Sequence, residues 1–568
     1  MERRQDRAHV CSDDDASVEE VRDRESHATS GQGRTQNLQA TLDAALIRAV
    51  YHQNIEATFD ALKQGANPNA DADEGMHPLH FAALYGNPNL LHLLIDYNAD
   101  VNLLCGGSGL SALHCATLMG HATSVNLLLE RNANPDVVTS FTARTPLQIA
   151  VSVVRPESVQ ITRALIEHGA NVNIVEDEDM TLLHICGNDA SMVKLLVDAG
   201  VNPMAVSKKE LTPLHRACRN GYLRKVKALV KGGPRVNDAM HSLKSPLHCA
   251  CDGGHLEVVR YLVEEAGADT FCQDRSGKLP IHQACKMKQR NIVDFFLDEC
   301  GFSPSVQDGK GNTCLHWACK KADNAFDDDA IEDNICTFVE SLLNRMPALI
   351  DLPNFHQQIP LHYAAVWNAS LCQVLVEQYK ADVTKRDQVG QTPLILAARQ
   401  GVISTVSYFT GNAAVDNDAG DCQNWTALHW AAFRYNERMI RKLLQNGANA
   451  NVKSTRGRTP LHLISRFDFP SSFQDRDILL DGIFDRTILF PSRPDMENHC
   501  VEILLEHGSD CMIIDRRGDL PFFLAAATGS VNDTYLMMRE AIGRGLFDNA
   551  TSKLKASSCQ KVEILDST

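Results

Sequence analysis

The polar residue with the clearest regular spacing in this sequence is a histidine that ends the short motif TPLH and its variants. Histidine binds metal ions and transfers protons near neutral pH. Both kinds of chemistry need several side chains that converge on one point, whereas these histidines are spread along most of the chain. The spacing therefore favours a structural role that is repeated once per motif, at His80, His114, His184, His215, His248, His282, His316, His362, His429 and His462.

Cysteine is the second candidate for chemistry, with 18 copies in 568 residues. Four of them directly follow an alanine and lie 33 or 34 residues apart, at Cys218, Cys251, Cys285 and Cys319. Such positions fall on successive packed helices about 8–10 Å apart, beyond the roughly 7 Å Cα separation that a disulfide bridges. We expect these thiols to be reduced and buried as small hydrophobic side chains. Zinc binding is the weaker alternative, because no paired CxxC motif is present.

Signatures of enzymes and of metal sites are missing from the sequence. It has no GxxxxGK[ST], HExxH, GxSxG or complete GxGxxG motif. The stretch from Asp71 to Gly75 begins like a calcium-binding loop, but Ala82 occupies the place of the glutamate that closes such a loop. We therefore expect no enzymatic activity, no metal site and no cofactor.

The elements that position these side chains can be read in residues 245–269, SPLHCACDGGHLEVVRYLVEEAGAD. Pro246 is typical of a first helical turn, and Gly253 with Gly254 ends that short helix. A second helix follows, with apolar residues on one face, and Gly267 closes it. Two helices this short cannot bury their apolar faces on each other alone, so neighbouring units must stack on them.

The same unit recurs along the chain, with one apolar anchor in each first helix. Most anchors are 33 or 34 residues apart, at Leu46, Leu79, Leu113, Leu147, Leu183, Leu214, Leu247, Ile281, Leu315, Leu361, Leu394, Leu428, Leu461 and Phe522. Around them stand HPLHFA, TPLHRA, SPLHCA and TALHWA, and several copies end in GANPN, GANVN or GANAN. The pattern resembles the ankyrin repeat family over about residues 41–543, in roughly fourteen copies.

The resemblance implies an all-α solenoid in which each repeat is a β-hairpin finger followed by two antiparallel helices. The fingers and the first helices would line its concave side. Residues 1–40 and 544–568 have few apolar residues and are expected to be disordered tails. Insertions near residues 321–334 and 466–498 separate the two helices of their repeats, and the copy anchored at Leu183 is shortened between its helices.

The composition indicates which type of fold and which cellular compartment to expect. Hydrophobic residues make up 44% of the chain but aromatic residues only 6%, which suits many small helical interfaces. No apolar run approaches the roughly 18 residues of a membrane helix, and residues 1–30 are polar where a signal peptide would be apolar. We expect a soluble chain in the cytoplasm, with the nucleus as the alternative.

The resemblance also implies where a partner binds, because ankyrin repeats usually meet ligands at finger positions before TPLH and just after its alanines. In the copies anchored from Leu214 to Leu461 these positions are mostly basic, with Asp252 as the one acid. The whole chain has a formal net charge of −16, so this basic surface is a segregated feature. With three aromatic side chains, the candidate partner-binding residues are Lys208, Lys209, Arg219, Lys244, Arg275, Lys278, Lys286, Lys310, Lys320, Lys321, Trp367, Arg399, Trp425, Phe433, Arg434, Arg456 and Arg458.

A basic concave face favours an acidic or phosphorylated segment of a protein partner, to which lysine and arginine donate charge-assisted hydrogen bonds. Trp367, Arg399 and Arg434 are expected to lie in a line, one repeat apart, as an exposed track for such a segment. We therefore expect a non-enzymatic scaffold or adaptor. The plain alternative is a solvated face whose lysines serve only solubility.

Three further hypotheses remain open. A basic groove could bind nucleic acid or anionic lipid, although the acidic residues Asp177 and Glu178 at the matching positions and the net charge disfavour this. The chain could be a substrate adaptor of a ubiquitin ligase, although no box rich in leucine and cysteine follows the last repeat. The insertion at 466–498 contains FDFPSSF and ILFPSRP, which suit either a second partner site or a tolerated surface loop.

Overall fold

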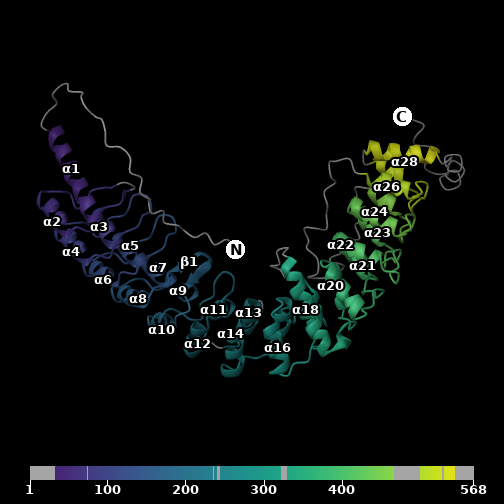
Figure 1. The fold of residues 1–568 in the computed structure, drawn as a ribbon, viewed down its shortest axis with the longest axis horizontal. Coiled ribbons are helices and arrows are strands. Elements are labelled where there is room, and N and C mark those ends of the chain that lie inside the picture. The colour runs from purple at the N-terminus through teal and green to yellow at the C-terminus, as the bar shows by residue number, and fades with distance from the viewer. Residues whose placement is uncertain are drawn as a thin grey trace. The chain divides into compact units, whose positions relative to one another are not determined.

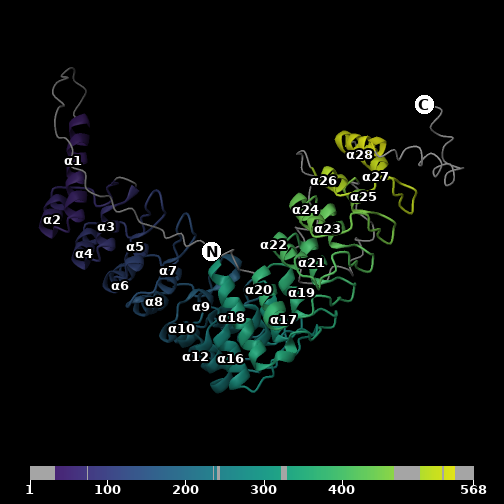
Figure 2. The same ribbon diagram turned by 45° about the vertical axis from the view of Figure 1, so that its right-hand side comes forward.

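The computed structural model describes residues 32–72, 75–233, 236–239, 244–321, 329–465, 499–527 and 530–543. The chain divides into two compact units, Met1–Val172 and Asn173–Thr568. Each unit is a row of helix pairs, which Figure 1 and Figure 2 show in chain order from purple to yellow. The insertion at 466–498, residues 1–31 of the first predicted tail and the predicted tail 544–568 lie outside the described residues.

The first unit contains α1 (Gln32–Tyr51), α2 (Ile55–Lys63), α3 (Pro78–Leu84), α4 (Pro88–Asp96), α5 (Ala112–Met119), α6 (Ala122–Glu130), α7 (Pro146–Ser152) and α8 (Ser158–Glu167). The odd-numbered helices pack on one another in chain order and the even-numbered helices do the same, which gives two helical layers. The predicted boundary of the first tail at residue 40 is wrong, because α1 begins at Gln32. Helix-favouring residues such as Gln39 and Ala40 extend the helix that carries the anchor Leu46.

The second unit repeats the same pairing. Its first helices are α9 (Leu182–Ile185), α11 (Pro213–Arg219), α13 (Pro246–Gly253), α15 (Pro280–Lys286), α17 (Cys314–Cys319), α19 (Pro360–Ala365), α21 (Pro393–Gln400), α23 (Ala427–Phe433), α25 (Pro460–Ile464) and α27 (Pro521–Ala527). Its second helices are α10 (Ala190–Asp198), α12 (Leu223–Lys231), α14 (Leu256–Arg260), α16 (Arg290–Asp298), α18 (Asp329–Arg345), α20 (Ala369–Gln373), α22 (Ile403–Thr410), α24 (Glu437–Gln445), α26 (Cys500–Glu506) and α28 (Val531–Gly543). Helix α18 begins within the predicted insertion at 321–334, so that insertion is partly helical.

Several first helices begin where a hydroxyl side chain and the motif histidine cap one another. In α13, the Ser245 hydroxyl accepts a hydrogen bond from the His248 N–H (3.4 Å), and His248 Nδ1 accepts one from the Ser245 N–H (3.3 Å). Pro246 then occupies the first helical turn. Every predicted anchor, from Leu46 to Phe522, is at most 6% exposed, which confirms the repeat assignment.

The histidines join neighbouring repeats, which confirms their predicted structural role. His362 Nδ1 accepts a hydrogen bond from the Ile359 N–H (3.1 Å), so Nε2 carries the proton and donates it to the Gln391 carbonyl (3.2 Å) in the next finger. Burial lowers the pKa of His362 to about 4, so the ring is neutral at pH 7. Nε2 also meets a carbonyl of the following repeat in His80, His114, His184, His215, His248, His282, His316, His429 and His462.

The predicted cysteine ladder lies in the core. Cys218, Cys251, Cys285 and Cys319 are free thiols with no exposed surface. Burial raises the pKa of Cys319 to about 12, so this residue stays a neutral thiol. These four cysteines therefore act as small hydrophobic side chains between stacked helices.

The fingers are tight turns that a carboxylate or amide side chain closes. Asp387 accepts hydrogen bonds at Oδ1 from the N–H groups of Val389 (3.1 Å) and Gln391 (2.8 Å). Asp274, Asp308, Asn354, Asp421 and Asp515 make the equivalent turns. Neighbouring fingers are linked through the backbone, for example from the Gly309 N–H to the Gly277 carbonyl (3.0 Å). Strands are short in the described residues, where β1 (Val175–Glu176) pairs antiparallel with β2 (Met180–Thr181).

Candidate partner-binding site

The predicted basic residues of the second unit form two groups, one in its earlier repeats and one in its later repeats. The earlier repeats, anchored from Leu214 to Leu315, gather several ammonium groups around one tryptophan. The later repeats, anchored from Leu394 to Leu461, pack some of their arginines among carboxylates and aromatic rings. Both groups occupy the same kinds of repeat position, but their surroundings differ.

Trp317, on α17, is the centre of the earlier group. The ammonium nitrogen of Lys278 lies 5.0 Å from the centroid of the Trp317 ring, and that of Lys320 lies 5.1 Å from it. Indole Nε1 donates a hydrogen bond to the Asp308 carboxylate (3.0 Å), which holds the buried ring in place. Two cations therefore share one positioned aromatic ring, an arrangement that favours both through cation–π attraction.

Two more lysines act on Lys278. Burial lowers the pKa of Lys278, the Asp274 carboxylate 3.3 Å away opposes this, and the positive charges of Lys286 and Lys244 lower it further. Positive charges that interact in this way belong to the same part of the structure. We use the term basic cluster for these lysines around Trp317, namely Lys244, Lys278, Lys286 and Lys320.

Carboxylates near the basic cluster already have partners. Asp252 pairs with Arg219 (3.3 Å) and accepts a hydrogen bond from the Gln283 amide (2.6 Å). Asp308 accepts hydrogen bonds from Trp317 and Asn312. The basic cluster thus gathers four lysines, and Asp274 pairs with Lys278 (3.3 Å).

Other predicted residues of the earlier repeats have varied surroundings. Arg275 and Lys321 are exposed, and Lys310 is half-exposed. Lys208 and Lys209 form ion pairs with Asp179 (3.6 Å) and Glu178 (2.6 Å) of the preceding finger. Such exposed pairs add little to stability, but they offset the positive charge of these two lysines.

Arg399, on α21, is buried, with only 2% of its surface exposed. Its guanidinium lies 5.1 Å from the centroid of the Trp430 ring and donates a hydrogen bond to Gln391 (3.2 Å). Burial lowers the pKa of Arg399, while the carboxylates of Asp387 and Asp421 act in the opposite direction. The prediction that Arg399 lies on an exposed track is therefore wrong, because the neighbouring fingers and helix α23 enclose it.

Arg458 is also enclosed. Its side chain and that of Asp515 are 4% and 1% exposed, and Arg458 Nε lies 3.3 Å from Asp515 Oδ2. This ion pair joins the finger before α25 to the next finger. Arg456, two residues earlier, remains half-exposed.

The predicted aromatic anchors and Arg434 contact neighbouring residues of the fold. Trp367 Nε1 donates a hydrogen bond to the Cys319 carbonyl (2.7 Å). Trp425 is buried, and its ring centroid lies 5.8 Å from that of Phe433. Arg434 Nη1 donates to the Arg399 carbonyl (3.0 Å). A role for these four residues in binding a partner stays a prediction.

Two lysines, of which Lys225 is fully buried, stabilise the irregular repeats and were not among the predicted residues. Helix α9 is four residues long, and the end of a short helix leaves carbonyl groups without helical partners. Lys225, with no exposed surface, donates from Nζ to the carbonyls of Cys186 (2.7 Å) and His184 (3.4 Å). Lys288 does the same at the end of α17, and burial lowers its pKa to about 8. A lysine in the apolar pattern of α12 is the sequence signal that identifies Lys225.

In the part of the chain that the structure describes, no three histidine, cysteine or acidic side chains come together as metal ligands. No described helix is both long and apolar enough to cross a membrane.

Comparison with known proteins agrees with the repeat architecture. A family model described as "Ankyrin repeats (3 copies)" matches residues 46–139, 185–274, 281–387, 361–454 and 410–481, and one described as "Ankyrin repeat" matches residues 143–177. Neurogenic locus notch homolog protein 1 is 38% identical over 105 residues in Danio rerio and 30% identical over 189 residues in Xenopus laevis. These alignments cover 18% and 30% of this chain but only 4% and 7% of the two relatives.

A third relative comes from a plant. E3 ubiquitin-protein ligase KEG of Arabidopsis thaliana is 34% identical over 129 residues, which are 22% of this chain and 6% of that protein. The chain thus spans less than a tenth of the length of each of these relatives. Together with the helix pairs, the fingers and the histidine bonds, the family models show that the chain belongs to the ankyrin repeat family.

Proposed function

We propose that this protein is a non-enzymatic scaffold or adaptor whose basic cluster docks an acidic or phosphorylated segment of a protein partner. Ankyrin repeats are general protein-interaction modules, and this chain is built from them. The observation that supports the acidic partner is the gathering of Lys244, Lys278, Lys286 and Lys320 around Trp317, in a chain of net charge −16. A cationic surface on an acidic protein attracts anionic partners selectively.

The geometry suits a carboxylate or phosphate group. Lysine ammonium groups donate charge-assisted hydrogen bonds to either anion, without the fixed planar fork of arginine. The ring of Trp317 holds the ammonium groups of the buried Lys278 and the half-exposed Lys320 in the same part of the site. A segment with several negative charges can therefore meet more than one lysine at once, and this favours it over a segment with one charge.

The test is a fluorescence anisotropy titration of the full chain with short labelled peptides. One peptide is rich in Asp and Glu, a second carries phosphoserine at the same positions, and a third is neutral. Lys244→Glu with Lys286→Glu should weaken binding of the two acidic peptides by at least about thirtyfold, or roughly 2 kcal/mol. The neutral peptide should bind poorly to every variant.

Two controls separate binding from folding in this titration. Because Lys286 is nine-tenths buried, the neutral pair Lys244→Gln with Lys286→Gln is measured too, with its helical content and melting temperature. The exposed pair Arg438→Glu with Arg441→Glu on α24 makes the same change in charge on a second helix. Wild-type affinity in a folded double variant of the basic cluster would refute the proposal. Equally tight binding of a single-stranded oligonucleotide, lost in the same variants, would favour nucleic acid instead.

A further inference from the structure

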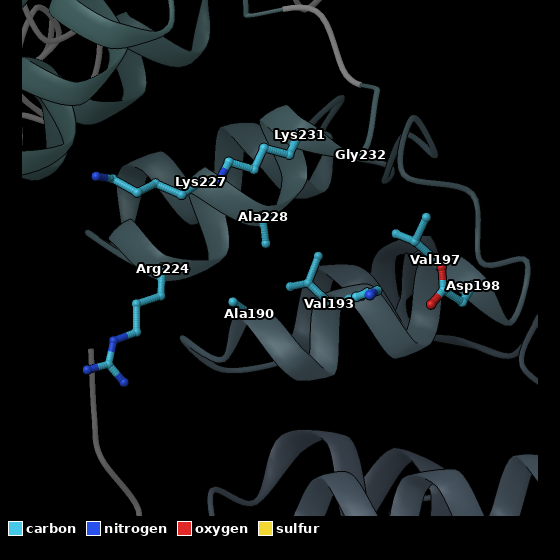
Figure 3. A pocket seen from close by; sticks show the side chains of 10 residues that line it. Ala190, Val193, Val197, Asp198, Arg224, Lys227, Ala228, Lys231 and Gly232 are labelled. Carbon is cyan, nitrogen blue, oxygen red and sulfur yellow. The ribbon is translucent and has the colours of Figure 1, made fainter.

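A groove separates α10 from α12 on the second helices of the shortened repeat and of its neighbour. The cavity has a volume of about 410 Å³. Its floor is apolar and small, formed by Ala190, Val193, Val197 and Ala228 (Figure 3). Basic side chains surround this floor, with Asp198 as the one acid, and they are Lys194, Arg224, Lys227 and Lys231.

The shortened repeat accounts for the groove. Helix α9 ends at Ile185, and α10 begins at Ala190 after a very short connection. Lys225 ties α12 to that connection, because its Nζ donates to the Cys186 carbonyl and its N–H donates to the Asn188 side chain (3.1 Å). Small residues on the facing sides of the two helices then leave space between them, since alanine cannot fill what a longer side chain would.

The charges around the groove are largely unpaired. Lys227 pairs with Glu265 (3.4 Å), and its ammonium lies 4.8 Å from the centroid of the Tyr261 ring. Lys194, Arg224 and Lys231 form no ion pair and no side-chain hydrogen bond among the residues that the structure describes. Among the described residues, these three cations therefore make no polar side-chain contact that would stabilise the fold.

We propose that this groove is a second binding site, which takes an acidic segment of a protein partner with an aliphatic side chain. The aliphatic group would lie on the floor, and neighbouring Asp or Glu residues would meet Lys194, Arg224 and Lys231. Charge complementarity selects an acidic occupant, and a half-open hollow at the small end of the usual 300–1,000 Å³ range admits side chains but not a folded surface. The groove lies on second helices, whereas the basic cluster lies on first helices and fingers, so the two sites are distinct.

The probe is a labelled peptide in which Asp and Glu alternate with Leu, titrated into the full chain. Lys194→Glu with Lys231→Glu reverses the charge at the edge of the groove, and Ala228→Leu fills the floor. Each variant should lower the affinity at least about tenfold. A peptide with Ser in place of Leu should bind more weakly to the wild-type chain, because it has nothing to place on the floor.

The matched control is Arg438→Glu with Arg441→Glu on α24, which reverses two positive charges on another second helix. It should leave the affinity unchanged, whereas in Lys244→Glu with Lys286→Glu of the basic cluster the Leu peptide should still bind more tightly than the Ser peptide, which separates this site from the proposed function. Unchanged affinity in both folded groove variants would overturn the proposal. Binding to phosphatidylserine vesicles that is lost in the groove variants, with peptide binding retained, would overturn the choice of a protein partner.

Discussion

Residues 244–321 and residues 387–465 are two stretches of one solenoid with similar basic residues at equivalent repeat positions, and their side chains have different surroundings. In the first stretch, Lys278 and Lys320 lie over the ring of Trp317, and Lys244 and Lys286 act on the charge of Lys278. In the second stretch, Arg399 and Arg458 are buried beside carboxylates. A base at a ligand-facing position of a repeat is therefore a binding candidate only where the neighbouring fingers do not already neutralise it.

The finger turns explain the difference between the two stretches. Both have an aspartate that closes the turn, but Asp274 and Asp308 have Lys278 and Trp317 as neighbours, whereas Asp387 and Asp421 both act on the buried guanidinium of Arg399. In the second stretch, the side chain of Arg399 fills the space beside the ring of Trp430. The same turn chemistry thus lies beside the proposed docking residues in one place and beside a buried arginine in the other.

The largest effect is expected from breaking the buried ion pair of the later stretch. Arg458→Ala should destabilise the repeats around α25 by about 3–5 kcal/mol, because it leaves the Asp515 carboxylate buried without its partner. Hydrogen exchange of α25 and of the finger at Asp515 measures this locally. The double change Arg458→Ala with Asp515→Asn should recover part of the loss. A cost below about 1 kcal/mol, typical of an exposed pair, would contradict the comparison.

Low pH should lower the stability of both stretches, because both contain motif histidines that hydrogen-bond to the following repeat. The folded pKa of His362 is about 4, below the unfolded value near 6.5, so the unfolded chain takes up the proton first as pH falls. Stability is then lost between about pH 6.5 and 4, by on the order of 3 kcal/mol for this ring. Denaturant titrations at several pH values measure the slope.

A natural substitution in this chain supplies the control for the acid experiment. Gln148 stands in the histidine position of α7, where its Oε1 accepts a hydrogen bond from the Thr145 N–H (2.9 Å). His362→Gln should therefore keep the cap and reduce the dependence of stability on pH. An unchanged acid slope in that folded variant would mean that other groups cause the loss.

Replacing the buried Arg399 by a neutral side chain should lower stability by less than Arg458→Ala does. Arg399→Gln is expected to lower stability by about 2 kcal/mol, because Asp387 and Asp421 lose a cationic neighbour and Trp430 loses its cation–π contact. Affinity for an acidic peptide should stay within a factor of about two, since the guanidinium is enclosed. Thermal melting and the anisotropy titration test both statements. Strongly weakened binding in a stable Arg399→Gln protein would reverse our assignment of the two stretches.

The smallest effect is expected at an exposed base of the earlier stretch. Arg275 is exposed in the finger before α15, so Arg275→Ala should change stability by less than about 0.5 kcal/mol. A modest loss of affinity for the acidic peptide is expected, because the positive field near the basic cluster decreases. A large drop in melting temperature would show that this finger depends on Arg275 for its structure.

The sequence was sufficient to predict much of the fold. The anchors, the histidine bonds and the cysteine ladder follow from spacing, because each repeat places equivalent residues in equivalent surroundings. The sequence was less informative where a residue departs from the pattern of its repeat. The start of α1 at Gln32 and the helical part of the insertion at 321–334 are of this kind, since neither segment has a counterpart in the other repeats.

The candidate site could be predicted only in part, for a physical reason. Whether a long basic side chain is exposed depends on the space and the charges that the next repeat offers. The aspartates that neutralise Arg399 come from two different fingers, and the one that pairs with Arg458 lies 57 residues away in the sequence. Lys225 was missed for a related reason, because its partners exist only where the preceding repeat is shortened.

The most direct test of the account is hydrogen exchange of the full chain with and without the phosphoserine peptide. We predict slower exchange in the fingers and first helices of residues 244–321 when the peptide binds, with no change in residues 387–465. The pair Lys244→Glu with Lys286→Glu should abolish this protection. Protection confined to residues 387–465, or protection that survives in the double variant, would contradict the assignment of the basic cluster as the docking site.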